Sequence, residues 1–263
     1  MHKLQPNSRI YIHGVAINPI NRDNAEKFIA DQLKKDGGDL PCAVFTPNAE
    51  MVVRAAADAH LAEILNSGDL NTPDGVGIIW AAKRLGTPLS ERIAGIELGE
   101  RAIAHCAEHG YRVFLLGGVR GVAEDAAEKL SKKHPDLCIC GKHHGYFDPS
   151  SEENERLIKI ILQAAPDLLI VCLGFPRQES WIMSNRYRLT SVKVMMALGG
   201  SLDVWSGRVR RAPRIIQRMR LEWLWRLLRE PSRLPRAAAL PSFVNLTLRA
   251  ARAKKRNFKA KLS

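Results

Sequence analysis

Short apolar runs alternate with amphipathic, helix-like segments along most of the chain. Mainly apolar runs that end near glycine, proline or asparagine predict strands at 11–17, 42–45, 112–116, 137–140, 167–173 and 192–198. Apolar positions at the helical period predict helices at 24–35, 49–65, 75–85, 96–109, 121–134, 152–164 and 178–188. Strands that are apolar on both faces and alternate with helices indicate an α/β fold, with a Rossmann-like, mostly parallel sheet and helices on both faces.

Glycines follow the ends of several predicted strands. Gly117 and Gly118 end one strand, and Gly174 ends another. Ligands of such sheets bind at the carboxyl ends of the strands, where glycine lets backbone N–H groups approach a phosphate. The segment LLGGVRGVAEDA is neither GxGxxG nor GxxxxGK[ST], so nucleotide binding and a simple tight turn both stay open. A dehydrogenase would also need an acid at a later strand end, which Asp136 fits poorly.

Positive charge is concentrated in the last part of the sequence. The formal net charge is +13, yet residues 1–203 hold 23 lysines and arginines against 25 acids. Residues 204–263 hold 17 lysines and arginines against two acids. We therefore expect an α/β domain over 1–206 and a basic helical appendage over 207–263, whose charge suits acidic lipid, nucleic acid or phosphate.

The appendage also has an apolar face. The apolar residues that share one predicted helical face are Ile216, Met219, Trp223, Leu224, Leu227 and Leu228. A basic amphipathic helix with tryptophans suits a membrane interface, whereas packing of the same face on the α/β domain remains the alternative. Nucleic-acid binding is a further possibility, although we find no recognition-helix, RRM or zinc-finger pattern.

Residue types that bind metal ions do not form a recognisable set in the sequence. There is no Asp-x-Asp motif, and no nearby carboxylate completes a ligand set with His143 and His144. Cys138 and Cys140 form a CxC pair that we expect to be buried on a strand. Five cysteines, with no signal-peptide pattern and no apolar run of membrane-spanning length, indicate a reduced cytosolic protein. We expect no metal and no cofactor.

The stretch NTPDGVGIIW raises a separate question, because Asp74 lies between a proline and a glycine at the start of a predicted helix. The local sequence favours an N-cap for that helix. A carboxylate fixed on a tight turn can also remove a proton during catalysis, and the two roles are compatible.

Seven blocks of the sequence support a specific comparison: TPNAEMVVRAA, LNTPDGVGIIWAAKRLG, ERIAG, FLLGG, HHGYF, LGFPRQE and GGSLDVWSGRVRRAPRIIQRMRLEWLWRLLREP. In this order, over about residues 10–236, they resemble the WecG/TagA/CpsF glycosyltransferase family, which includes a xanthan-type glucosyltransferase. The resemblance implies an inverting, metal-independent enzyme at the cytoplasmic face of the bacterial inner membrane. It would move a sugar from a UDP-sugar to a sugar attached to undecaprenyl diphosphate.

The resemblance also implies the catalytic and donor-binding residues. Asp74 matches the general base that takes a proton from the attacking hydroxyl. Thr46 and Asn48 match residues that orient the donor sugar, although Thr-Pro-Asn alone is also a helix-start turn. Arg92 matches a cation near the diphosphate, with a solvated surface arginine as the alternative, and Gln178 matches a donor contact.

Further matches concern the uridine and the lipid. Tyr146 and Asp203 match residues around the uridine, although without the resemblance we would place the tyrosine in the core and the aspartate at a helix cap. Arg226, Arg233 and Arg236 match arginines that meet the lipid diphosphate.

The expected partners are therefore a UDP-sugar donor, a polyprenyl-diphosphate-linked sugar acceptor and an acidic membrane surface, without nucleic acid. The expected linkage is β, in bacterial surface polysaccharide synthesis. Family members can self-associate, so a homo-oligomer is one alternative, and the oligomeric state stays open. The donor sugar stays open among glucose, N-acetylmannosamine and its uronate. Residues 237–263 match no block, and their role rests on charge and amphipathicity alone.

Overall fold

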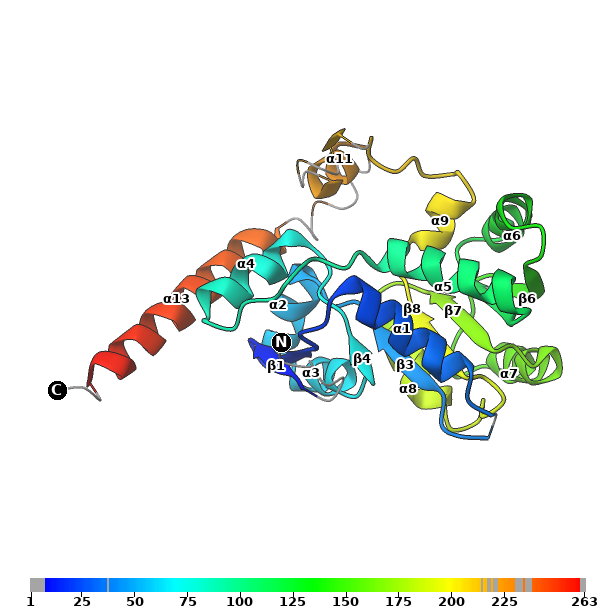
Figure 1. The fold of residues 1–263 in the computed structure, drawn as a ribbon, viewed down its shortest axis with the longest axis horizontal. Coiled ribbons are helices and arrows are strands. Elements are labelled where there is room, and N and C mark those ends of the chain that lie inside the picture. Colours follow the sequence, from blue (N-terminus) through cyan, green and yellow to red (C-terminus); the bar gives the residue numbers. More distant parts are fainter. Residues whose placement is uncertain are drawn as a thin grey trace.

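The computed structural model describes residues 8–36, 38–213, 215–216, 219, 222–229, 234 and 238–260. Its centre is a parallel sheet with strand order β4-β3-β8-β7-β5-β6 (Figure 1). The strands are β3 (Cys42–Phe45), β4 (Leu70–Asn71), β5 (Arg112–Gly117), β6 (Cys138–His143), β7 (Leu168–Cys172) and β8 (Val194–Ala197). The predicted α/β class and parallel sheet are confirmed.

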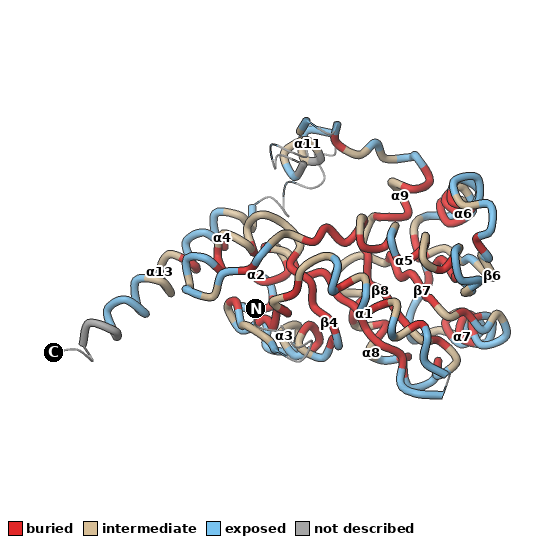
Figure 2. The backbone as a smooth tube through the Cα atoms, in the orientation of Figure 1, coloured by how far each residue is buried: buried red, intermediate tan, exposed pale blue. Residues whose placement is uncertain are grey.

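Helices cover both faces of this sheet. One face packs against α1 (Arg22–Leu33), α5 (Gly95–His109), α6 (Val122–Lys133) and α9 (Ser201–Trp205). The other packs against α7 (Glu152–Ala164) and α8 (Arg177–Asn185). Successive side chains of a strand point to opposite faces, so each inner strand needs apolar residues throughout. Figure 2 shows the result, buried central strands between partly exposed helices.

A third apolar cluster lies beside the sheet. It combines the hairpin β1 (Ile10–Ile12) and β2 (Val15–Ile17) with α2 (Ala49–Ala57), α3 (Ala59–Asn66), α4 (Val76–Arg84) and α13 (Ala239–Ala260). The remaining described helix of the basic segment, α11 (Glu222–Arg229), lies apart from the sheet in Figure 1.

Several predicted elements differ from the structure. The strand predicted at 11–17 is a hairpin, because His13 and Gly14 turn the chain with positive φ angles of 51° and 87°. The helix predicted at 49–65 breaks at Asp58, whose extended backbone ends α2 and whose side chain caps α3. The prediction also missed β4 and α9, which are too short to show a period.

The cysteine prediction was only partly right. Cys42, Cys106 and Cys172 are buried, whereas Cys138 is exposed and Cys140 is half-buried. Both residues of the CxC pair lie on β6, which pairs only with β5 at the edge of the sheet. An edge strand is covered less completely than a central one, which explains the difference.

The start of α13 is part of the folded body. Phe243 is 1% exposed and meets the edge of the His13 ring, while His13 Nε2 lies 2.9 Å from the Thr247 hydroxyl. Further along, Lys254 Nζ donates to the Leu85 carbonyl oxygen at the end of α4. Beyond this contact α13 extends past the body toward the C-terminus (Figure 1), and Lys255 and Arg256 are exposed (Figure 2).

We expect Phe243→Ala to release α13, because a buried phenylalanine truncated to alanine costs about 3–5 kcal/mol. Amide protons of α13 should exchange much faster with solvent, and trypsin should cut at Arg249 or Arg252, while amides of the sheet stay protected. Val244→Ala is the matched control, since Val244 is 41% exposed. Equal α13 protection in both variants would contradict this assignment.

Candidate active site

The carboxyl ends of the strands open onto a cavity of about 640 Å³. It lies beside the neighbouring strands β3 and β8. From β3 the chain continues to β4 on one side of this pair, whereas it enters β8 from β7 on the other side. Such a reversal of strand order leaves a crevice between the connections, which is the usual ligand site in sheets of this type.

Most of the predicted site residues meet in this cavity. Those that line it are Thr46, Asn48, Asp74, Gly118, Tyr146, Gly174, Gln178 and Asp203. Of the other described positions, Arg92 and Gly117 lie outside the lining. A Cβ at Gly117 would come within 2.3 Å of the Cys172 carbonyl oxygen, so this glycine is required by the approach of β5 to β7.

The predicted arginines of the basic segment are only partly visible. The structure describes the backbone of Arg226 within α11, and Arg233 and Arg236 fall outside the described residues.

Asp74 does not cap the helix that follows it. Gly75 is the N-cap of α4, and no side chain caps that helix. Instead, Asp74 Oδ2 accepts a long hydrogen bond of 3.5 Å from the N–H of Gly95, the first residue of α5. Its own N–H donates to the Pro47 carbonyl oxygen at 3.1 Å. The carboxylate is thus held at the positive end of α5 and faces the cavity.

Thr46 shares this environment. Its side chain is buried, and a Cβ at Gly95 would approach both its methyl group and its hydroxyl oxygen to 3.0 Å. The absence of a side chain at residue 95 therefore lets Thr46 and Asp74 both contact the start of α5. The neighbouring Asn48 also serves the fold, because its Oδ1 accepts the Met51 N–H as the N-cap of α2.

Glycines shape another part of the cavity surface. Gly118 has φ of 71°, and its carbonyl oxygen accepts the Gly145 N–H at 2.8 Å. This bond joins the loop after β5 to the loop after β6 and leaves backbone, rather than side chains, at the cavity surface. Tyr146 follows with 68% exposure, so it is not the core residue that local sequence alone suggested. An exposed ring at a cavity rim suits stacking against a planar ligand.

The oxygen and the nitrogen of the Gln178 side-chain amide both form hydrogen bonds. Its Oε1 accepts the Gly199 N–H at 2.9 Å, and its Nε2 donates to Glu179 Oε1 at 2.9 Å. The Glu179 carboxyl is fully buried, and burial raises its pKa to about 7. Sequence reasoning missed Glu179, since an acid beside a glutamine in a helix gives no sign of its burial.

Two further features of the cavity were not predicted. Arg177 lines it, with its guanidinium 5.1 Å from the centre of the Phe147 ring and hydrogen bonded to the Phe147 carbonyl oxygen. An apolar wall also borders it, formed by Met51, Val76, Phe175, Trp223, Leu227 and Leu240. Part of the apolar stripe of the appendage, Trp223 and Leu227, thus reaches the cavity.

Two arginines of the basic segment are engaged in ion pairs with the body. Arg208 lies 2.8 Å from Asp125 of α6, and Arg211 lies 2.6 Å from Glu97 of α5. These pairs fix the chain that leads away from α9, so these two charges serve its attachment.

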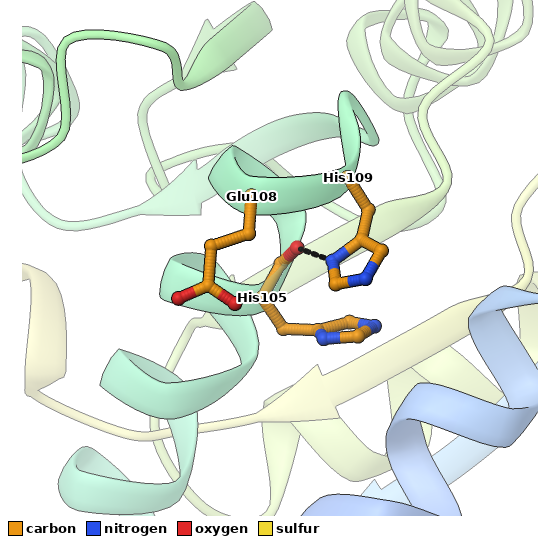
Figure 3. A group of neighbouring side chains, drawn as sticks. All are labelled: His105, Glu108 and His109. Atoms are coloured by element: carbon orange, nitrogen blue, oxygen red, sulfur yellow. Dashed lines mark hydrogen bonds between the residues drawn. The ribbon is translucent and has the colours of Figure 1, made fainter.

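Among the described residues, two groups of side chains of the types that bind metal ions lie outside the cavity lining. On α5, His105, Glu108 and His109 are neighbours (Figure 3). Their imidazole rings lie face to face, with centroids 4.1 Å apart and planes tilted by 35°. Lone pairs in the ring planes then do not converge on one point, and we assign no metal there.

The second group corrects a prediction. The fold brings Glu153 to 3.7 Å from His144 Nε2, beside His143, although no nearby carboxylate was expected from the sequence. Glu153 follows ten residues after His143 on α7, and only the loop between β6 and α7 brings the two together.

Most of the chain matches a known protein family. Residues 10–257 match the model of the glycosyl transferase WecG/TagA/CpsF family. The chain is 35% identical over 239 residues to an enzyme of Staphylococcus aureus strain MRSA252 named N-acetylglucosaminyldiphosphoundecaprenol N-acetyl-beta-D-mannosaminyltransferase. The enzymes of strains MW2 and NCTC 8325 with this name are equally similar, and each alignment covers 91% of this chain and 89% of the relative.

Within the described residues, no helix is long and apolar enough to cross a bilayer. With the family model spanning residues 10–257 and relatives aligned over 91% of its length, the chain belongs to the WecG/TagA/CpsF family and is a glycosyl transferase.

Proposed function

We propose that this enzyme transfers a hexose, N-acetylhexosamine or N-acetylhexosaminuronate from a UDP-sugar to a sugar on undecaprenyl diphosphate, with inversion and without a metal ion. The acceptor follows from the names of the relatives, which act on N-acetylglucosaminyldiphosphoundecaprenol. The observation that carries the mechanism is the half-buried Asp74 carboxylate, held against α5 on the wall of the cavity.

In the proposed step, an acceptor hydroxyl oxygen bonds to the anomeric carbon while the bond from that carbon to the UDP oxygen breaks. The hydroxyl proton passes to Asp74, which acts as the general base. Because UDP-sugars of this kind carry the sugar in α linkage, attack from the opposite side gives a β product. The relatives' names specify such a beta-mannosaminyl product.

The departing UDP needs positive charge. Among the described residues that line the cavity, Arg177 is the one arginine or lysine. We assign it to the diphosphate together with backbone N–H groups of the glycine loops, since guanidinium–phosphate hydrogen bonds are strong. Arg226, Arg233 and Arg236 are proposed to join from the basic segment when the lipid diphosphate is bound.

The apolar wall and the basic segment account for the lipid part of the acceptor. Trp223 and Leu227 of α11 and Leu240 of α13 border the cavity. We assign residues 207–263 to acceptor and membrane contact, and residues 1–206 to donor binding and catalysis. The protein would work as a peripheral protein at the cytoplasmic face of the inner membrane.

Two alternatives from the sequence are set aside. A dehydrogenase and a nucleic-acid-binding protein are both inconsistent with membership of a glycosyl transferase family over residues 10–257.

We expect Asp74→Asn to lower kcat by about 10²–10⁴-fold, because the amide keeps the shape of the carboxylate but takes no proton. The Michaelis constant for the donor should change little. Product formation on a lipid-diphosphate-sugar acceptor can be followed by mass spectrometry, with Asp23→Asn on the exposed side of α1 as the control. A variant with more than half of the wild-type kcat would remove Asp74 from this role.

Chelation provides a second test. We expect EDTA to leave the transfer rate unchanged, because arginine and backbone N–H groups are assigned to the leaving diphosphate. Loss of activity in EDTA that Mg²⁺ or Mn²⁺ restores would disprove the metal-free mechanism.

Neutralising Arg249, Arg252 and Arg256 to glutamine should weaken binding to vesicles that contain acidic lipid. Each basic residue near such a surface contributes about 1 kcal/mol, so three should change the partition coefficient by ~100-fold. Transfer to a short-chain, water-soluble acceptor should persist. The control neutralises three exposed basic residues of α6 and α7, Lys132, Arg156 and Lys159, and equal vesicle binding by both variants would refute the membrane role of α13.

A further inference from the structure

A short chain of hydrogen bonds joins α8 to the loop after β8. Gly199 donates its N–H to Gln178 Oε1, and Gln178 Nε2 donates to Glu179 Oε1, each over 2.9 Å. Gly199 has φ of 55° and, with Gly200, lines the cavity before α9 begins. The amide of Gln178 therefore holds a loop of the cavity wall in place.

Glu179 is an unusual residue in its position. Its side chain is fully buried, and within the described part of the chain Oε2 has no hydrogen-bond partner. Burial of a carboxyl group without full hydrogen bonding costs folding free energy. A carboxyl kept at that cost beside a ligand cavity is a candidate for a role in function.

The hydrogen-bonding capacity of Glu179 fixes the direction of the Gln178 amide. If the amide turned by 180°, its NH₂ group would face the Gly199 N–H and two donors would oppose each other. Its oxygen would then face Glu179 Oε1, and as long as Oε1 carries no proton, two acceptors would oppose each other as well. With an unprotonated Oε1 at this place, only the observed orientation satisfies both neighbours. An apolar side chain at residue 179 would remove the part of this preference that comes from Glu179 and leave the part that comes from the Gly199 N–H.

We propose that Glu179 is a positioning residue for donor binding, because its carboxyl group orients the Gln178 amide that fixes the Gly199–Gly200 loop. The proposal rests on the proposed function, in which the cavity binds a UDP-sugar. Glu179 itself touches Gln178 and is absent from the cavity lining among the described residues.

The charged surroundings of Glu179 agree with this role. Burial is the main influence and raises its pKa to about 7, while the Gln178 hydrogen bond and the charge of Arg54 on α2 act in the opposite direction. Arg54 lies over the Phe175 ring and 3.8 Å from Glu50. Because the folded-state pKa exceeds the ordinary value of 4.5, the neutral form prevails below about pH 7, and the free energy of unfolding falls as pH rises from about 4.5 to about 7.

The kinetic test compares two substitutions. Glu179→Gln keeps an acceptor oxygen for Gln178 Nε2, and we expect its Michaelis constant for the UDP-sugar to stay within about threefold of wild type. Glu179→Leu removes the acceptor, and we expect a rise of about tenfold, as for loss of one buried hydrogen bond, with kcat within about threefold. Glu155→Gln, an exposed carboxylate on α7, is the control. A folded Glu179→Leu protein with a wild-type Michaelis constant would overturn the proposal.

A spectroscopic test uses the wild-type protein and does not depend on a stable leucine variant. The ¹⁵N side-chain amide signal of Gln178, assigned by its loss in Gln178→Ala, should shift between pH 5.5 and 8.5 with a midpoint near 7. In Glu179→Gln the same signal should stay constant over this range. A Gln178 side-chain signal at pH 8.5 that is the same in the wild type and in Glu179→Gln would show that Glu179 does not control the amide.

These readouts separate the two proposals. If the amide titrates as expected and isothermal titration finds no UDP-sugar binding, the proposed donor is wrong and the contact between Glu179 and Gln178 stands. If UDP-sugars bind and the Gln178 amide signal is the same in the wild type and in Glu179→Gln at pH 8.5, the donor stands and the role of Glu179 is wrong.

Discussion

Burial of a parallel sheet on both faces is the constraint on which the other features depend. A parallel pair needs a crossover, so each strand of the sheet is followed by a connection that starts at the same edge. Six strand ends therefore deliver their loops to one side of the molecule. The reversal of strand order between β3 and β8 separates these loops and leaves room for the cavity.

The cavity combines two kinds of surface. Loops after the strands contribute Thr46, Asp74 and the glycine turns, whereas α11 and α13 contribute an apolar wall. A sugar nucleotide and a lipid-linked acceptor differ in the same way, since one is anionic and polar and the other carries a hydrocarbon chain. The polar surface comes from loops that follow the strands, and part of the apolar surface comes from the basic segment, which therefore borders the cavity.

The fold class could be predicted from the sequence because central strands buried on both faces are apolar without interruption, as in Leu168–Cys172. Asp74 and its turn were also identifiable, but its partner Gly95 is 21 residues away and is brought close only by the packing of α5. The exposure of Cys138 depends on the position of β6 at the sheet edge, which strand composition does not encode. Glu179 stayed unrecognised because its burial depends on which side of α8 meets the sheet.

The third apolar cluster has a consequence for synthesis of the protein. It unites Ile12 of the first hairpin with Phe243 of α13, two residues separated by nearly the whole sequence. During translation, the apolar sides of the hairpin and α4 stay exposed until α13 emerges from the ribosomal exit tunnel. Nascent chains that stall before residue 243 would therefore expose an apolar patch, which is the kind of surface that chaperones and quality-control proteases recognise.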